Sequence, residues 1–247
     1  MKEITLSRDS IRFLLFQRSG YRFPILRILR TIFKELGVSQ YYDKYLDTYL
    51  FSYIEQLRLT KISEMYFADL EIIYNNIKGI LPKNAINVLD IGSGMAGIDL
   101  FIANHYNYTA NIYLLDKEGE SDKIVAGYHH NQDNFSHYNC FEFANNFLVR
   151  NGVPISKIHN IDISTRPFPS KIKFNLIISL LSWGFHYPID TYIDAVYEGL
   201  SEDGILIMDI RKDTRGEYIL EKYFGTKPIL LIQEKNSCRY AVKKINN

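Results

Sequence analysis

From Asn87 onward, short apolar segments alternate with segments of helical periodicity, and few folds accommodate this order. The segments 86–91, 111–116, 158–163, 174–180 and 204–210 are predicted to be strands. Helical segments are expected at 98–105, 139–152, 190–200 and 216–225. Strands that alternate with helices in this way predict an α/β fold with a parallel, doubly wound sheet. Right-handed crossovers then bring the C-terminal ends of the strands to one edge, where such sheets bind ligands.

The end of the chain follows a different order. Two apolar segments, 227–235 and 237–245, are joined by a turn near Asn236 and have no helix between them. Strands joined by so short a connection are antiparallel neighbours. The chain is therefore predicted to end in an antiparallel hairpin.

Before Pro82 the sequence indicates helices rather than strands, so we divide the chain into an N-terminal helical extension, 1–80, and an α/β domain, 81–247. One helix is expected between Pro24 and Gly37, because a proline suits a first helical position and a glycine the end. Its apolar residues recur at helical spacing, and Arg27, Arg30 and Lys34 take the other side. Such a helix commonly packs its apolar stripe on the domain, but a basic amphipathic helix can also lie on a membrane.

A tyrosine-rich segment follows this helix. Tyr42, Tyr45, Tyr49 and Tyr53 fall three or four residues apart, so they share one face of a predicted helix. Tyrosine offers an apolar ring and a polar hydroxyl. The segment is interpreted either as a helix packed on the sheet or as a lid over a polar ligand, with Tyr42 as a candidate acceptor contact.

The composition of the chain limits the classes of protein to which it can belong. The 247 residues carry a formal net charge of +1, and nucleic-acid-binding proteins usually show a strong basic excess. Two cysteines, Cys140 and Cys238, are too few for a disulfide framework and suggest a reducing compartment. No apolar run has the length of a signal-peptide core or a membrane span. We therefore expect a cytoplasmic protein that binds neither nucleic acid nor the membrane interior; the sequence leaves its oligomeric state open.

A glycine-rich loop follows the first strand, in the stretch NVLDIGSGMAGIDL. Gly92, Gly94 and Gly97 satisfy G-x-G-x-x-G, the fingerprint of nicotinamide dinucleotide sites. Asp90 stands at the mouth of this loop, where it would repel a pyrophosphate. A ligand with a cationic head has no such conflict, and S-adenosylmethionine carries a sulfonium and an ammonium group but no phosphate.

At these residues the sequence resembles the class I S-adenosylmethionine-dependent methyltransferases, whose first motif is an acid followed by G-x-G-x-G. DIGSGMA matches through Gly94, whereas Ala96 stands where a third glycine is common. Asp116 ends the second strand, where the family binds the ribose hydroxyls with a carboxylate. The resemblance covers roughly 84–244. It implies a Rossmann-like sheet with a terminal antiparallel hairpin, the seven-stranded methyltransferase fold, and S-adenosylmethionine as cofactor.

Carried over residue by residue, the resemblance implies a set of cofactor contacts. Asp90 and Gly92 would serve the methionine end, and Gly94 would lie under the adenosine. Asp116 would bind the ribose. Asp162, after the third strand, would accept from the adenine amino group; its alternative is a turn residue. The set is completed by Ser93, Lys117, Ile163 against the adenine ring and Leu180 near the sulfonium.

The segment after the fourth strand, SLLSWGFHYPID, bears on the acceptor. It lacks the D/N-P-P-Y signature of the adenine and amide-nitrogen methyltransferases, which disfavours a nucleobase amino group. Ser182, His186 and Tyr187 are the candidate catalytic residues, and Trp183 is a candidate acceptor contact. A histidine can take the proton from an attacking hydroxyl, although His186 could instead only hold the loop together. The loop is similar to that of sugar O-methyltransferases encoded with bacterial surface polysaccharides, and to methyltransferases of the capsular O-methyl phosphoramidate group.

Two further clusters are weighed as acceptor contacts. His129, His130, Asp133 and His137 fit no standard metal spacing, so no metal is predicted and His129 is taken as a candidate acceptor contact on a substrate-facing loop. After the fifth strand, Arg211 and Lys212 could hold a phosphate or belong to a solvated turn.

The sequence thus predicts an S-adenosylmethionine-dependent O-methyltransferase. Its expected acceptor is a small molecule, the hydroxyl of a sugar or nucleotide-activated sugar in bacterial surface polysaccharide or capsule biosynthesis. The alternative acceptor is a phosphoryl or phosphoramidate oxygen of a nucleotide-linked precursor. A cofactor-binding but inactive partner subunit and a dehydrogenase are the other classes considered.

Overall fold

The computed structural model describes residues 3–21, 24–38, 57–119 and 139–245. Tyr42, Tyr45, Tyr49 and Tyr53 lie outside these ranges, as does the histidine cluster with His129. The expectations placed on those residues stay predictions.

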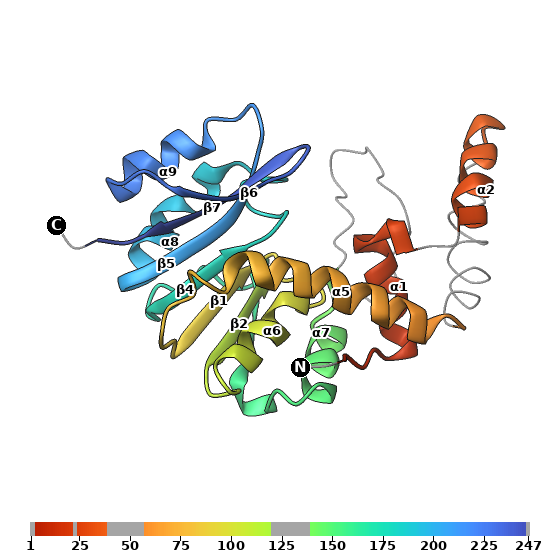
Figure 1. Ribbon diagram of the computed structural model, residues 1–247, viewed down its shortest axis with the longest axis horizontal. Coiled ribbons are helices and arrows are strands. Elements are labelled where there is room, and N and C mark those ends of the chain that lie inside the picture. The colour runs from red at the N-terminus through yellow and green to blue at the C-terminus, as the bar shows by residue number, and fades with distance from the viewer. Residues whose placement is uncertain (1–2, 22–23, 39–56, 120–138, 246–247) are drawn as a thin grey trace.

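A seven-stranded sheet forms the centre of the molecule (Figure 1), with strand order β3-β2-β1-β4-β5-β7-β6. The strands are β1 Asn87–Ile91, β2 Asn111–Asp116, β3 Ile158–Asp162, β4 Phe174–Ser179, β5 Leu200–Arg211, β6 Ile229–Gln233 and β7 Ser237–Lys243. Strands β1 to β5 pair in parallel, and β7 pairs antiparallel with both β5 and β6. The predicted α/β fold and its terminal antiparallel hairpin are confirmed.

Helices cover both faces of this sheet. The helices of the described residues are α1 Arg8–Gln17, α2 Pro24–Glu35, α5 Leu59–Ile77, α6 Gly97–His105, α7 Phe141–Arg150, α8 Ile193–Gly199 and α9 Gly216–Phe224, with short 3-10 turns at Ser19–Tyr21, Ile155–Lys157 and Ile189–Thr191. Buried side chains of α1, α5, α6 and α7 form one core with the sheet, and those of α8 and α9 form a second core. The segment 163–173, between β3 and β4, contains no helix.

The N-terminal helix α1 packs against the α/β domain. Ile11 and Leu14 are fully buried in the same core as α5 and α6. At its C-terminal end, Gln17 comes close to Gly94 of the glycine-rich loop. Since this loop marks the ligand-binding edge of the sheet, α1 lies beside the candidate site.

Helix α2 does not bury the stripe that the sequence led us to expect on the domain. Ile28, Ile32 and Leu36 are 54%, 43% and 69% exposed. They lie at helical spacing, as predicted, but the side they share faces solvent. The packing interpretation is therefore wrong for these three residues. None of the described helices combines the length and the apolar character that crossing a membrane requires.

Two neighbouring residues at the start of α6 differ in what their positions require. Ala96 precedes the helix with φ of 55°, a left-handed conformation that glycine adopts at no steric cost. Gly97 is needed for a different reason, because a Cβ there would clash with the hydroxyl of Tyr66 on α5. Gly97 thus serves helix packing rather than the ligand.

Substitutions at Ala96 and Gly97 are expected to have opposite effects on the free energy of unfolding. Gly97→Ala is expected to lower the free energy of unfolding by about 1–3 kcal/mol, the usual cost of overpacking, since the Tyr66 ring is buried and cannot turn aside. Ala96→Gly, its matched control, should leave stability unchanged or raise it by up to about 1 kcal/mol by relieving the left-handed strain. Urea unfolding measures both. An equal loss in the two variants would contradict this assignment.

Candidate functional site

A cavity of about 190 Å³ opens at the C-terminal ends of β1 and β2. Seven of the predicted site residues line it: Gly92, Asp116, Lys117, Ile163, Ser182, Trp183 and Tyr187. Ile91, Leu115 and Tyr192 line it as well and were not singled out from the sequence. The cavity joins the glycine-rich loop, the end of β2, the turn after β3 and the loop after β4, which is the arrangement that the doubly wound sheet predicts.

The other predicted residues of the described chain lie around this cavity without lining it. They are Asp90, Ser93, Gly94, Asp162, Leu180, His186, Arg211 and Lys212. Asp90, at the end of β1, and Ser93, within the glycine-rich loop, are both buried. Leu180 packs against the core on the α5 and α6 side of the sheet.

The glycine-rich loop is packed closely against other segments of the chain. Gly92 has φ of 79° and donates from its backbone N–H to the carbonyl oxygen of Leu115 at 2.7 Å. A Cβ at Gly92 would clash with Oγ of Ser182, so only glycine lets the loop after β4 lie directly on it. Two loops that are distant in sequence therefore meet at the cavity.

Asp116 fastens this loop to β2. Its carboxylate accepts hydrogen bonds from the N–H of Gly94 at 2.9 Å and of Lys117 at 2.8 Å. Burial raises the pKa of Asp116 to about 6, and the two backbone bonds act in the opposite direction. A carboxylate in this position faces the cavity and can accept from hydroxyl groups of a ligand.

A second acid, Asp99 on α6, faces Asp90 beneath the loop. Both side chains are buried, at 3% exposed for Asp90 and 0% for Asp99. Within the described part of the chain, Oδ1 of Asp90 and both oxygens of Asp99 find no hydrogen-bond donor. Two facing carboxyls bond each other only when one holds a proton. Burial and the neighbouring Asp99 hold the pKa of Asp90 well above its usual range, and burial raises the pKa of Asp99 to about 7.

Asp99 was not among the site residues predicted from the sequence. The signal was present, because Asp99 is the only charged residue in the apolar stretch GIDLFIA that follows the loop. A cation near these two carboxyl groups would favour their ionised form, whereas a phosphate would disfavour it. This pair therefore fits a ligand with a cationic group at the loop and does not fit a pyrophosphate.

The carboxyl pair predicts how stability depends on pH. The folded-state pKa values of Asp90, Asp99 and Asp116 lie above the ordinary value of 3.8, so the folded chain holds more protons than the unfolded chain from about pH 4 to about pH 7. These groups make the free energy of unfolding fall as the pH rises through that interval. Asp99→Asn should weaken this fall, as measured by urea unfolding at about pH 5 and about pH 7.5.

Asp162 supplies the matched control for that measurement. Hydrogen bonds lower its pKa, so its contribution to stability is lost only as the pH falls below about 4, outside the measured interval. Asp162→Asn should therefore leave the difference in stability between about pH 5 and about pH 7.5 unchanged. A change as large as that of Asp99→Asn would contradict the assignment.

Asp162 holds the turn after β3. Its Oδ1 accepts from the N–H and the hydroxyl of Ser164, at 3.0 and 2.6 Å, and from the N–H of Glu118 at 3.3 Å. Its Oδ2 accepts from the hydroxyl of Thr165 at 3.2 Å. The turn-residue interpretation describes these contacts, and the adenine contact stays a prediction. Ile163, the next residue, lines the cavity.

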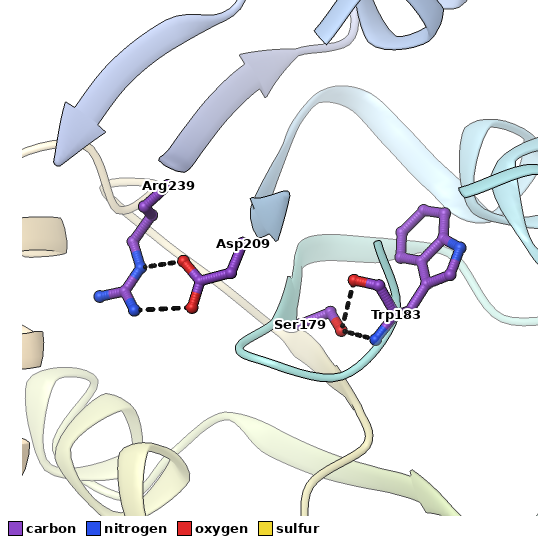
Figure 2. Close-up of polar contacts among 4 residues, drawn as sticks. All are labelled: Ser179, Trp183, Asp209 and Arg239. Carbon is purple, nitrogen blue, oxygen red and sulfur yellow. Dashed lines mark hydrogen bonds and ion pairs between the residues drawn. The ribbon is translucent and has the colours of Figure 1, made fainter. Parts of the chain in front are cut away.

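Trp183 anchors the loop after β4 (Figure 2). Its indole is fully buried, and Nε1 donates to the carbonyl oxygen of Ile189 at 2.9 Å. Its backbone N–H donates to Oγ of Ser179 at 3.0 Å, and that hydroxyl donates to the carbonyl oxygen of Ile91 at 2.8 Å. The ring thus fixes the loop to β1 and β4 while forming part of the cavity wall, and an acceptor contact by Trp183 stays a prediction.

Tyr187 and His186 occupy different surroundings. Tyr187 lines the cavity and is 43% exposed, and burial, followed by the charge of Asp116, raises its pKa. His186 lies outside the lining, with its ring edge-on to Phe185 at 4.9 Å between centroids. Partial burial and the positive charge of Arg211 lower the pKa of His186, so its imidazole is neutral at pH 7.

Arg211 reaches the same loop from the end of β5. Its guanidinium carbon lies 4.8 Å from the ring centroid of Phe185, and its backbone N–H donates to the carbonyl oxygen of Gly184 at 3.0 Å. Lys212 follows, and its N–H donates to the carbonyl oxygen of Asn236. Both residues therefore belong to the same sheet edge as the cavity, as the sequence predicts, although neither lines it.

Beside this edge, Asp209 and Arg239 form a buried ion pair between β5 and β7 (Figure 2). Nε and Nη2 of Arg239 donate to the two carboxylate oxygens of Asp209 at 2.8 and 2.9 Å. The side chains of Asp209 and Arg239 are only 3% and 8% exposed. This pairing is not evident from the sequence, because the register of β7 on β5 decides which residue lies opposite Asp209.

In the part of the chain that the structure describes, no three histidine, cysteine, aspartate or glutamate side chains come together as metal ligands.

Comparison with known proteins bears on the fold. No protein-family model matches the sequence, and no curated protein matches it. Solved structures do match. One is the precorrin-6Y C5,15-methyltransferase of Geobacter metallireducens GS-15, with 12% identity and a TM-score of 0.51 over 71% of this chain and 88% of that one. Another is a methyltransferase of Pyrococcus furiosus, with 14% identity and a TM-score of 0.50 over 72% of this chain and 83% of that one.

At these identities the likeness concerns the fold. The strand order, the antiparallel β7 and the position of the glycine-rich loop agree with the fold expected from the sequence. The chain has the seven-stranded fold of the class I methyltransferases.

Proposed function

We propose that the protein is an S-adenosylmethionine-dependent methyltransferase. The observation that carries this proposal is the buried pair Asp90 and Asp99 beneath the glycine-rich loop, in which Oδ1 of Asp90 and both oxygens of Asp99 find no donor among the described residues. A cationic ligand complements this pair, whereas the pyrophosphate of a nicotinamide dinucleotide does not. Asp116 stands at the end of the adjacent strand, where it can accept from two ribose hydroxyls.

Different residues around the cavity would contact different parts of the cofactor. Asp116 would bind the ribose, Ile163 would lie against the adenine, and the loop at Gly92 would pass close to the methionine end. When bound, S-adenosylmethionine supplies a methyl group on a sulfonium. The remaining task of this chain is to place an acceptor oxygen in line with that methyl and to keep water away.

For the acceptor we propose the hydroxyl of a sugar or nucleotide-activated sugar in bacterial surface polysaccharide synthesis, a cytoplasmic step. Tyr187 and Ser182 line the cavity and offer hydroxyl groups to a polar acceptor. A sugar hydroxyl needs a base to take its proton, and a neutral imidazole can act as one. His186, next to Tyr187 and neutral at pH 7, is the candidate, and it would have to turn from Phe185 toward the cavity.

A phosphoryl or phosphoramidate oxygen is the second candidate acceptor. It is favoured by Arg211, whose guanidinium lies at the same loop with its charge against the ring of Phe185. Arg211 and Lys212 could hold an anion by charge-assisted bonds. An anionic oxygen needs no base, so His186 would be dispensable for this reaction.

Replacing His186 distinguishes the two acceptors. For a hydroxyl, His186→Ala should lower turnover about 10²–10⁴-fold, the usual contribution of a general base. The wild-type rate should rise with pH and level off below about pH 6.5, because the pKa of His186 is lowered. For a phosphoryl oxygen, His186→Ala should change turnover little and Arg211→Ala should mainly raise KM.

The measurement is transfer of labelled methyl to sugar nucleotides and to phosphorylated acceptors, at pH values below and above about 6.5. His159→Ala is the matched control, since its ring stacks on Tyr113 at 4.5 Å between centroids and does not line the cavity. Full activity of His186→Ala and Arg211→Ala on the acceptor would place the acceptor site on other loops. Cofactor binding without transfer to any acceptor would favour an inactive partner subunit.

A further inference from the structure

The apolar face of α2, formed by Ile28, Ile32 and Leu36, is a surface that the proposed chemistry does not use. These three side chains are 54%, 43% and 69% exposed, although they follow one another at the spacing of a single helical side. In Figure 1 the helix stands at the edge of the molecule, away from the sheet and beyond α1. A row of exposed large apolar side chains of this kind marks an interaction surface.

The charge around this face indicates what it meets. Between Asp9 and Glu35, the last residue of α2, the sequence holds six basic residues and no acidic one: Arg12, Arg18, Arg22, Arg27, Arg30 and Lys34. The whole chain is balanced, with 29 basic and 28 acidic residues, so the positive charge is concentrated here. By sequence spacing, Arg27, Arg30 and Lys34 fall on the side of α2 opposite to the apolar face.

We propose that α2 lies on the surface of an anionic lipid bilayer, with its apolar face in the boundary between headgroups and acyl chains. A short helix with one apolar side, basic residues on the other and low overall hydrophobicity has the properties of an interfacial anchor. A second copy of the chain is a poorer occupant, because pairing two such helices would bring two basic segments together. A nucleic acid would engage the charges but leave the apolar face in water.

Docking in this way would have a consequence for the site. Helix α1, which is separated from α2 by the 3-10 turn Ser19–Tyr21, ends with Gln17 beside Gly94 of the glycine-rich loop. The membrane-facing helix is therefore connected through a few residues to the edge of the sheet that carries the cavity. The inference does not depend on the proposed methyl transfer, because it rests on α2 alone.

Sedimentation of the full chain with lipid vesicles tests the proposal. The protein should bind vesicles containing about one third phosphatidylglycerol at least tenfold more tightly than pure phosphatidylcholine vesicles. Raising the salt from about 0.1 to about 0.5 M should weaken the anionic binding. Arg27→Gln with Arg30→Gln should weaken it by roughly tenfold or more, at about fivefold per basic residue.

The apolar contribution is tested by the double variant Ile28→Ser with Ile32→Ser. It should lose at least tenfold in vesicle affinity, since the removed side chains would leave the acyl boundary. Its matched control is Ile72→Ser with Ile155→Ser, which removes two isoleucines that are 60% and 64% exposed elsewhere. The control should bind vesicles like the wild type, and both double variants should keep the wild-type melting temperature.

Three results would overturn the proposal. The first is wild-type protein that binds neither kind of vesicle, or both equally. The second is a wild-type dimer that the Ile28→Ser, Ile32→Ser variant dissociates without any vesicle binding, which would assign the face to a second copy. The third is a marked loss of melting temperature in that variant alone, which would assign the face to packing within the chain.

Discussion

Asp116→Ala is expected to weaken binding of S-adenosylmethionine by at least a hundredfold. A carboxylate that accepts two ribose hydroxyls makes charge-assisted hydrogen bonds, each about 1.5–3 kcal/mol. Losing both amounts to more than two factors of ten at about 1.4 kcal/mol each. The variant also loses the acceptor for the N–H of Gly94, which leaves the glycine-rich loop less well positioned. Isothermal titration calorimetry measures the change.

Asp162→Ala is the matched control for this experiment. It removes a carboxylate from the end of the neighbouring strand, where β2 and β3 pair Asp116 with Asp162. Because the Asp162 oxygens are bonded to Ser164, Thr165 and Glu118, its loss should loosen the turn and change the dissociation constant much less. An unchanged dissociation constant in a folded Asp116→Ala variant would refute the ribose assignment.

The largest effect on stability is expected from Asp209→Ala. The substitution leaves the guanidinium of Arg239 buried without its partner, and breaking a buried ion pair in this way costs about 3–5 kcal/mol. Urea unfolding should show a fall of that size. Lys243→Ala, which removes the exposed ion pair with Asp203, is the control and should change stability by less than about 1 kcal/mol.

Replacing both partners distinguishes the contribution of the ion pair to stability from that of the volume its side chains fill. Asp209→Leu combined with Arg239→Met fills a similar volume with apolar groups, so most of the lost stability should return. A double variant as unstable as Asp209→Ala would mean that Asp209 and Arg239 stabilise this edge of the sheet by more than the attraction between their charges.

Much of the fold could be predicted because the strands are short, apolar and separated by helices. The predicted strand 111–116 is β2 as observed, and the hairpin around Asn236 followed from the absence of a helix between its strands. The site could be predicted where a single backbone segment carries it, as in the glycine-rich loop and the ends of β2 and β3.

Contacts between distant segments could not be predicted in the same way. Asp99 meets Asp90 only once α6 has folded back on β1, and Arg239 faces Asp209 only in the register of β7 on β5. Gly97 matched a ligand-binding pattern, but the neighbour that requires it is Tyr66, from a helix more than thirty residues earlier. The periodicity of α2 was correct, whereas the surroundings of its apolar face depend on the tertiary structure.

The most direct test of the central claim is a calorimetric titration of the purified chain with S-adenosylmethionine, S-adenosylhomocysteine and NAD. The buried pair Asp90 and Asp99 and the carboxylate of Asp116 predict binding of S-adenosylmethionine, and of S-adenosylhomocysteine, with no binding of NAD. Asp99→Asn should weaken both of the former and create no affinity for NAD. Binding of NAD alone would contradict the account, because a pyrophosphate would then occupy the loop that two carboxylates support.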